Sequence, residues 1–302
     1  MLCPIDFSTP SRAALRTALA LAATARVRLH VLAVIEDGSS ASAATPLSAD
    51  ARPRLEQAAR DAVTAELPAG SHWAPAIDVS VKSGAPDECI RRTAVETDAD
   101  LIVLGTHGRS GGHQWALGST AARLLRTPPC AVLLISGETA TFATLTPDRP
   151  ELSVRRILAA TDFGKDADRA VSVAAALARD WHSELVLAHV LPALPPQLTE
   201  GEAATLAEYD AGMVEAATDH LRAMTAGTRG VKATHCLQRG TPHVELLALA
   251  TRERADLIVI GSVGRGTSHQ SITGFTAWRM AGAAPCPILL LPSPRQVEEA
   301  RL

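Results

Sequence analysis

The strongest constraint on this chain is an internal repeat with a constant spacing. Glycine-rich stretches in its two halves match each other at a separation of 156 residues. The matched glycines are Gly105 with Gly261, Gly108 with Gly264, and Gly118 with Gly274. The same shift carries Asp6 onto Asp162 and Cys130 onto Cys286. Because no insertion interrupts these markers, the chain is predicted to be a tandem duplication of one domain, and its 302 residues are enough for two.

Each copy alternates short apolar runs with amphipathic stretches. In the first copy, strands are predicted at 2–5, 27–35, 77–81, 101–104 and 130–135, with helices at about 9–24, 51–67, 86–97 and from 118. In the second copy, strands are predicted at 157–161, 185–190, 231–238, 257–260 and 288–291, with helices near 166–180, 203–225, 242–253 and from 274. Alternation of this kind predicts a parallel sheet with right-handed crossovers. Residues 137–153 read as a linker between domains at 1–136 and 154–302.

The stretch after the fourth strand has the composition of a phosphate-binding loop. A buried apolar run, Leu101 to Leu104, leads into Gly105 and Gly108, and Gly118 then opens a helical pattern. Glycines let the backbone approach a ligand, and free N–H groups at a helix start face an anion. The spacing is neither a Walker loop nor the dinucleotide fingerprint. A plain tight turn is the alternative interpretation.

Composition and charge exclude several classes of protein. The net charge of −3 gives no electrostatic reason for a nucleic acid or an anionic membrane as partner. No apolar run reaches the ~18–20 residues of a membrane span, and the first residues lack the pattern of a signal peptide. The five cysteines form no C-x-x-C, so we expect mostly buried, inert thiols and no metal centre built from protein side chains. These features predict a cytoplasmic protein.

The spacing Gly105-x2-Gly108-x9-Gly118-Ser119 resembles the nucleotide-binding signature of the universal stress protein family. The resemblance covers nearly the whole chain, twice. It implies an α/β fold of two tandem Rossmann-like domains of the adenine nucleotide α-hydrolase-like type. Each would have a five-stranded parallel sheet of order 3-2-1-4-5, with helices on both faces. Strands one and four are then neighbours, and ligands of open α/β sheets bind in the crevice at such a point.

By the same resemblance, the first copy binds ATP, with Mg²⁺ bridging its phosphates. The implied ATP-binding residues are Pro4, Ile5, Asp6, Val34, Leu104, Gly105, His107, Gly108, Arg109, Gly118, Ser119 and Thr120. In this assignment Asp6 lies beside the nucleotide and Val34 lines the adenine pocket. A purely structural alternative is that Asp6 only begins the first helix, as an N-cap or turn residue, and that Arg109 is solvated surface.

The second copy departs from the signature at one informative position. Its corresponding residues are Thr161, Asp162, Val190, Ile260, Gly261, Val263, Gly264, Arg265, Gly274, Phe275 and Thr276. Phe275 stands where the signature has Ser or Thr, so a hydroxyl is lost and a ring could crowd the phosphates. We therefore expect the first domain to be the main site. The second is degraded, selective for a smaller ligand, or functional through backbone contacts alone.

The resemblance implies a nucleotide-responsive factor of the stress response. Two alternatives remain: an interaction protein that binds no nucleotide, and a slow ATPase or nucleotide hydrolase. The sequence shows no nucleophile–base pair that would support efficient catalysis. Family members pair through their fifth strands, which here implies 130–135 against 286–291 within one chain. The sequence leaves open whether two chains also form a dimer.

Overall fold

The computed structural model describes residues 1–36, 51–106, 117–136, 142–193, 200–263 and 275–301. The first half comprises β1 (Leu2–Ile5), α1 (Thr9–Ala25), β2 (Leu29–Ile35), α2 (Ala51–Glu66), β3 (Ile77–Ser83), α3 (Pro86–Glu96), β4 (Leu101–Gly105), α4 (Ser119–Leu124) and β5 (Ala131–Ile135). The second half comprises β8 (Arg156–Ala160), α5 (Lys165–Asp180), β9 (Glu184–Leu191), α6 (Glu200–Gly227), β10 (Ala233–Arg239), α7 (Pro242–Arg252), β11 (Leu257–Gly261), α8 (Phe275–Ala281) and β12 (Ile288–Leu291). These elements confirm the predicted alternation in both halves.

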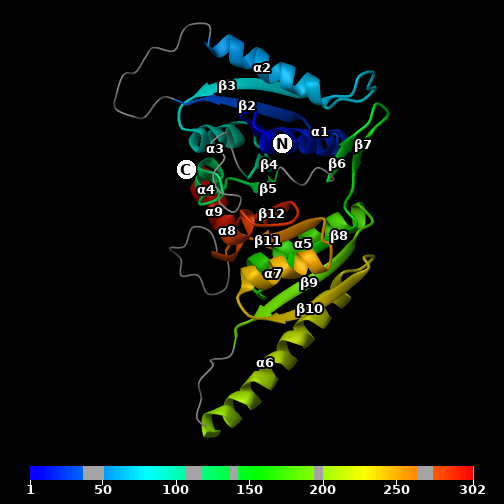
Figure 1. Cartoon of the computed structure of the whole chain (residues 1–302), viewed down its shortest axis with the longest axis vertical. Coiled ribbons are helices and arrows are strands. Elements are labelled where there is room, and N and C mark those ends of the chain that lie inside the picture. Colours follow the sequence, from blue (N-terminus) through cyan, green and yellow to red (C-terminus); the bar gives the residue numbers. More distant parts are fainter. Residues whose placement is uncertain (37–50, 107–116, 137–141, 194–199, 264–274, 302) are drawn as a thin grey trace.

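The strands form one continuous ten-stranded sheet, stacked along the long axis of the molecule (Figure 1). Its order is β3-β2-β1-β4-β5 in the first half, then β12-β11-β8-β9-β10 in the second. All neighbours are parallel within each half. The halves join where β5 meets β12 in antiparallel register, with Leu133 opposite Leu289 and Leu134 opposite Ile288. The predicted order and the predicted pairing of fifth strands are both confirmed.

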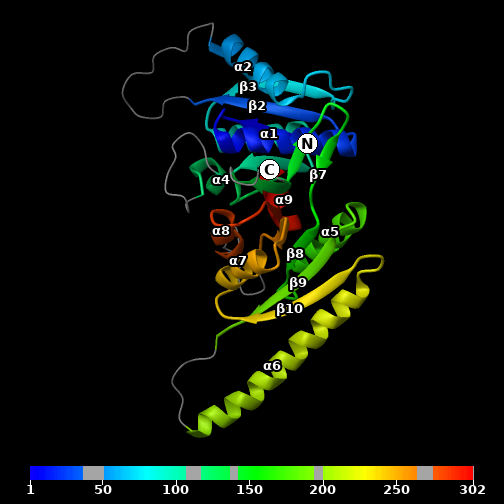
Figure 2. The same ribbon diagram turned by 45° about the vertical axis from the view of Figure 1, so that its right-hand side comes forward.

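Two apolar layers cover the sheet, one on each face. One layer packs α1, α2, α5 and α6 against the sheet, with Leu15, Ala59 and Ala170 in its core. The other packs α3, α4, α7 and α8, with Leu124 and Leu249 in its core. Each layer draws residues from both halves, so the core continues across the β5–β12 junction. α6 lies along β9 and β10 and extends past the end of the sheet (Figure 2).

Four of the five cysteines are buried, as expected, and three of these lie in the two layers: Cys3, Cys130 and Cys286. Burial raises the pKa of Cys130 and of Cys286 to about 12. A thiol with so high a pKa stays protonated at neutral pH and is a poor nucleophile. Cys236, on the edge strand β10, is partly exposed.

The stretch predicted as a linker contains a small antiparallel hairpin that packs on α1. Its strands are β6 (Ala143–Leu145) and β7 (Pro150–Leu152). The indole Nε1 of Trp73 donates a hydrogen bond of 2.8 Å to the carbonyl oxygen of Thr146. Buried Phe142 meets Trp181 of the second half edge to face, with ring centroids 6.4 Å apart. The connection between the halves therefore adds packing to both of them.

A last helix, α9 (Pro294–Arg301), was not predicted from the sequence. It is held through Gln296, whose side chain is buried although amides are usually exposed. The Gln296 Oε1 accepts hydrogen bonds from the Ser262 hydroxyl and, at 2.9 Å, from the Ser293 N–H. Since this contact is polar, no apolar periodicity marked the helix in the sequence.

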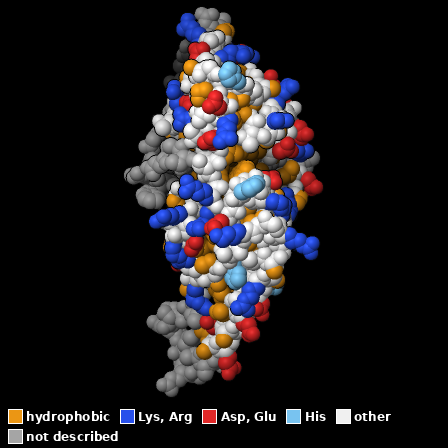
Figure 3. Space-filling model, turned by 90° about the vertical axis from the view of Figure 1, so that its right-hand side faces the viewer, with side chains coloured by type: hydrophobic (Ala, Val, Ile, Leu, Met, Phe, Trp, Pro, Cys, Tyr) orange, Lys and Arg blue, Asp and Glu red, His pale blue; other side chains and the backbone are white. Residues whose placement is uncertain are grey.

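The described helices and one face of the surface bear on two classes of partner, membranes and nucleic acids. None of the described helices combines the length and the apolar character needed to cross a membrane. On the face shown in Figure 3, the described Lys and Arg side chains alternate with Asp and Glu. That face therefore carries no continuous basic surface of the kind that binds nucleic acid.

Candidate functional site

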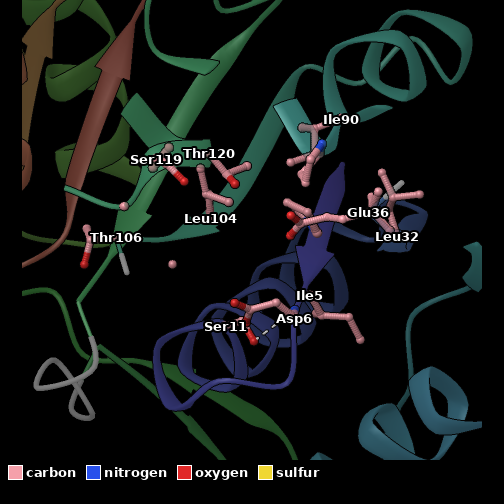
Figure 4. A pocket seen from close by; sticks show the side chains of 16 residues that line it. Ile5, Asp6, Ser11, Leu32, Glu36, Ile90, Leu104, Thr106, Ser119 and Thr120 are labelled. Carbon is pink, nitrogen blue, oxygen red and sulfur yellow. Dashed lines mark hydrogen bonds between the residues drawn. The ribbon is translucent and has the colours of Figure 1, made fainter. Parts of the chain in front are cut away.

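A cavity of about 280 Å³ opens at the carboxyl ends of β1, β2 and β4 (Figure 4). Its lining residues are Pro4, Ile5, Asp6, Ser11, Leu32, Val34, Glu36, Pro86, Ile90, Leu104, Gly105, Thr106, Gly118, Ser119, Thr120 and Ala121. Every described residue of the predicted first-copy set is among them. The remaining three, His107, Gly108 and Arg109, lie outside the described residues. The cavity occupies the switch point of the first half-sheet, where β1 and β4 are neighbours.

The turn from β1 into α1 forms one wall of the cavity. The Asp6 Oδ1 accepts hydrogen bonds from the Ser8 N–H at 3.0 Å and from the Ser8 hydroxyl at 2.5 Å. Ser8 in turn caps α1, since its Oγ accepts from the Ser11 N–H at 3.3 Å. Phe7 between them adopts a left-handed conformation with φ of 67°. Asp6 thus belongs to the turn and to the cavity wall at once, so the structural alternative and the binding interpretation are compatible.

The start of α4 forms the opposite wall. The Gly118 N–H donates a hydrogen bond of 2.8 Å to the Thr106 carbonyl oxygen, which fixes the entry to the helix. Ser119 and Thr120 then begin α4 and line the cavity beside Leu104 (Figure 4). One turn further on, the Arg123 Nε donates a 2.8 Å hydrogen bond to the Asp87 carboxylate, which ties α4 to α3.

Gly105 is required by packing, apart from any ligand. A Cβ atom at this position would lie 2.9 Å from the Pro10 carbonyl carbon and 3.0 Å from the Ser11 nitrogen. These atoms belong to the backbone at the start of α1, which cannot easily move aside. In the second half, a Cβ on Gly261 would similarly lie 3.2 Å from the Asp166 carbonyl oxygen. Part of the repeated glycine pattern therefore reflects the close approach of a helix to the sheet.

We expect Gly105→Ala to destabilise the chain by about 1–3 kcal/mol, the usual cost of overpacking a tight site. The matched control is Gly212→Ala within α6, where nothing lies within 4 Å of the added Cβ. Alanine there should instead stabilise the helix by roughly 0.5–1 kcal/mol. Urea denaturation of the wild type and of both variants measures these changes in the free energy of unfolding. A Gly105→Ala variant as stable as the wild type would show that the start of α1 shifts to accommodate the added methyl group.

Seven lining residues were missed by the sequence reasoning: Ser11, Leu32, Glu36, Pro86, Ile90, Thr106 and Ala121. The alternation of side chains along β2 contained a usable signal. Leu32, Val34 and Glu36 are two residues apart and so share one face of the strand. Pro86 and Ile90 are four apart on α3, also on one face. No local pattern, however, indicates that α3 closes over the end of β2.

In the second half, the corresponding described residues lie at the equivalent ends of strands and helices. Thr161 and Asp162 follow β8, Val190 lies near the end of β9, and Ile260, Gly261 and Val263 lie at and after the end of β11. Phe275 and Thr276 begin α8, while Gly264, Arg265, Gly274 and the Phe275 side chain lie outside the described residues.

The turn after β8 also has its own contacts. The Asp162 Oδ1 accepts a hydrogen bond from the Gly164 N–H at 2.9 Å, and Phe163 repeats the left-handed conformation of Phe7 with φ of 60°. The His189 ring lies 4.3 Å from the Phe163 ring, and its Nδ1 is 2.8 Å from the Thr161 carbonyl oxygen. The strand ends are conserved in position between the halves, while the groups around them differ.

A family model for the universal stress protein family matches residues 1–136 and 153–292. The chain belongs to the universal stress protein family. It is therefore a tandem universal stress protein, with one family domain in each half. Within the described residues, no group of three or more His, Cys, Asp or Glu side chains could hold a metal ion.

Curated relatives match both one domain and the tandem arrangement. A protein named as a universal stress protein from Mycolicibacterium smegmatis is 28% identical over 314 aligned positions, covering 96% of each chain. A shorter one from Thermus aquaticus, "in QAH/OAS sulfhydrylase 3′region", is 32% identical over 138 residues, covering 45% of this chain and 98% of its own length.

Among solved structures, a universal stress protein from Archaeoglobus fulgidus superposes with a TM-score of 0.64 at 22% identity. It covers 97% of this chain and 95% of its own. A protein of Pseudomonas aeruginosa described as functionally unknown gives a TM-score of 0.68 at 18% identity, covering 99% and 94%. At these identities the likenesses concern the fold, and they show that the tandem arrangement recurs.

Proposed function

We propose that this universal stress protein binds ATP, with Mg²⁺, in the cavity of its first half and acts in the stress response as a nucleotide-responsive binding protein. One observation carries the proposal. The described residues among those that the resemblance implied, from three separate strands and one helix start, line a single cavity at the switch point of the sheet. Many members of the family bind ATP, which raises the expectation for this chain.

The cavity has an apolar end and a polar end that suit the two ends of a nucleotide. Leu32, Val34 and Ile90 offer apolar surface for a base, while Ser119 and Thr120 offer hydroxyls at the start of α4. The volume of about 280 Å³ is slightly below the usual range for ligand pockets, roughly 300–1,000 Å³. It suits the nucleoside, with the phosphates at the start of α4.

Mg²⁺ fits this site as a companion of the nucleotide. The donors near the start of α4 are hydroxyl oxygens, and Asp6 supplies a carboxylate at the neighbouring strand end. Mg²⁺ commonly binds through substrate phosphates, a few protein oxygens and water, so it needs no cage of protein carboxylates. When bound, it would neutralise phosphate charge. The Ser119 hydroxyl is the protein group that we expect to face it.

To test the proposal, the full chain is purified without added nucleotide and then denatured. Mass spectrometry identifies any ligand that is released, and the ratio of ligand to protein is measured. We expect one adenine nucleotide per chain, because the second half lacks the hydroxyl that Ser119 supplies. Two per chain would show that Phe275 is tolerated and would overturn the preference for the first half. No nucleotide, followed by no heat in a titration with ATP and Mg²⁺, would overturn the proposed function and favour an interaction protein.

A further inference from the structure

We propose that Glu36 sets the base specificity of this site, by accepting a hydrogen bond from the exocyclic 6-amino group of adenine. The inference rests on the proposed function, since it concerns the same cavity. It names a residue outside the glycine signature and assigns the ligand a 6-aminopurine base.

Glu36 is placed to meet a ligand. It directly follows the last residue of β2, and its side chain points into the cavity between Ile90 and Asp6 (Figure 4). No described residue donates a hydrogen bond to its carboxylate or forms an ion pair with it. The other carboxylate of the lining, that of Asp6, already accepts two hydrogen bonds from Ser8. Among the described residues, none therefore competes with a bound molecule for the Glu36 carboxylate.

The order of the strands assigns Glu36 to the base end of the ligand. The sheet runs β2, β1, β4, with neighbouring strands ~4.8 Å apart, and α4 follows β4. Phosphates at Ser119 and Thr120 place the ribose near Asp6 at the end of β1. The base then reaches the end of β2. There it meets the apolar side chains of Leu32, Val34 and Ile90, with Glu36 as the one ionisable group among the described lining residues of that end.

The chemistry of a carboxylate selects what the base can present to it. An ionised carboxylate only accepts hydrogen bonds, so it favours an amino group. A purine without the 6-amino group offers it nothing, and a carbonyl oxygen at the same position would face it acceptor to acceptor. The negative charge also disfavours phosphates at this end, which fixes the direction of the nucleotide. Pockets of this type commonly combine an apolar lining with a few such orienting groups.

The second half lacks this group. The position equivalent to Glu36 is Pro192, directly after β9, and the position equivalent to Leu32 is Ala188. Proline has neither a carboxylate nor an N–H group to offer a base. A nucleotide in the second crevice would therefore bind without the discrimination that Glu36 gives the first.

The test compares two ligands on the full chain in the presence of Mg²⁺: ATP and purine riboside triphosphate, which lacks only the 6-amino group. We expect the wild type to bind ATP at least about tenfold more tightly, as a hydrogen bond to a charged acceptor warrants. Glu36→Ala should lose this preference and bind ATP about as weakly as the wild type binds the 6-deamino ligand. Glu36→Gln, whose amide oxygen still accepts, should keep part of the preference. Glu208→Ala, which removes an exposed carboxylate from α6 at the far end of the molecule, is the matched control and should keep all of it.

The outcomes separate this proposal from the function on which it rests. ATP binding by the wild type with no preference over the 6-deamino ligand would overturn the role of Glu36 and leave the proposed function standing. If the Glu36→Ala variant still prefers ATP over the 6-deamino ligand, the role of Glu36 is likewise overturned and the proposed function stands. Failure of the wild type to bind ATP at all would overturn the proposed function itself. Because Glu36 is exposed and makes no bond to a described residue, its variants should keep the wild-type melting temperature.

Discussion

Gly118→Val is expected to lower ATP affinity at least about 100-fold, or about 2.7 kcal/mol, while the chain stays folded. Gly118 lines the cavity directly before α4, so a branched side chain there takes space that the nucleotide needs. Its φ of −58° and ψ of 148° lie in the extended region that valine adopts readily. Its N–H can still donate to the Thr106 carbonyl oxygen. Binding should therefore be lost for a steric reason, without loss of the local backbone.

Isothermal titration with ATP and Mg²⁺ measures this loss, with thermal unfolding as the check on the fold. Gly212→Val is the matched control, since Gly212 lies in α6 with nothing within 4 Å of an added Cβ. It should bind ATP as the wild type does. Unchanged ATP affinity of Gly118→Val would contradict the placement of the phosphates at the start of α4. Loss of the fold would show that Gly118 is required for the structure itself.

Leu134→Asp is expected to remove the cooperative unfolding transition altogether. Leu134 is 1% exposed, lies on β5 and faces Ile288 of β12 across the junction of the two halves. A carboxylate there would be buried in the apolar layer that both halves share, whose described core residues are all hydrophobic and offer it no cation. A core substitution that buries a charge without a partner can lower the free energy of unfolding by more than about 4 kcal/mol, and the total for a domain is roughly 5–15 kcal/mol. Separation of the strands would also expose two apolar edges.

Urea denaturation and size-exclusion chromatography measure this effect. The variant should elute as an aggregate or unfold without a sharp midpoint. Leu134→Met is the matched control, because swaps that conserve volume usually cost less than about 1.5 kcal/mol. A soluble Leu134→Asp variant with a sharp transition near that of the wild type would mean that the halves are stable without the β5–β12 pairing.

The sequence predicted the sheet well because its strands carry two independent signals. Each strand is a short apolar run bounded by turns, and each occurs twice at a shift of 156 residues. The hairpin β6–β7 and helix α9 carry neither signal. The hairpin strands are three residues long, and Gln296 anchors α9 through hydrogen bonds instead of an apolar face. Elements held by polar or isolated contacts leave little periodicity to detect.

The candidate site was predicted only where the residues follow a motif. Asp6, Gly105 and Ser119 stand at strand or helix ends that the pattern marks, and they do meet in one cavity. Ile90 and Glu36 join that cavity because α3 closes over the end of β2, which is a long-range contact. Local sequence fixes which way a side chain points along its own element, but not which other element it will meet.

The antiparallel pairing of β5 with β12 places both of these strands inside the ten-stranded sheet, with β3 and β10 as its outermost strands. In a lone half, the fifth strand would be an edge strand with unpaired backbone N–H and C=O groups. A separate second chain could cover such an edge only at a sufficient protein concentration. Because β5 and β12 belong to one chain, their pairing does not depend on the concentration of the protein.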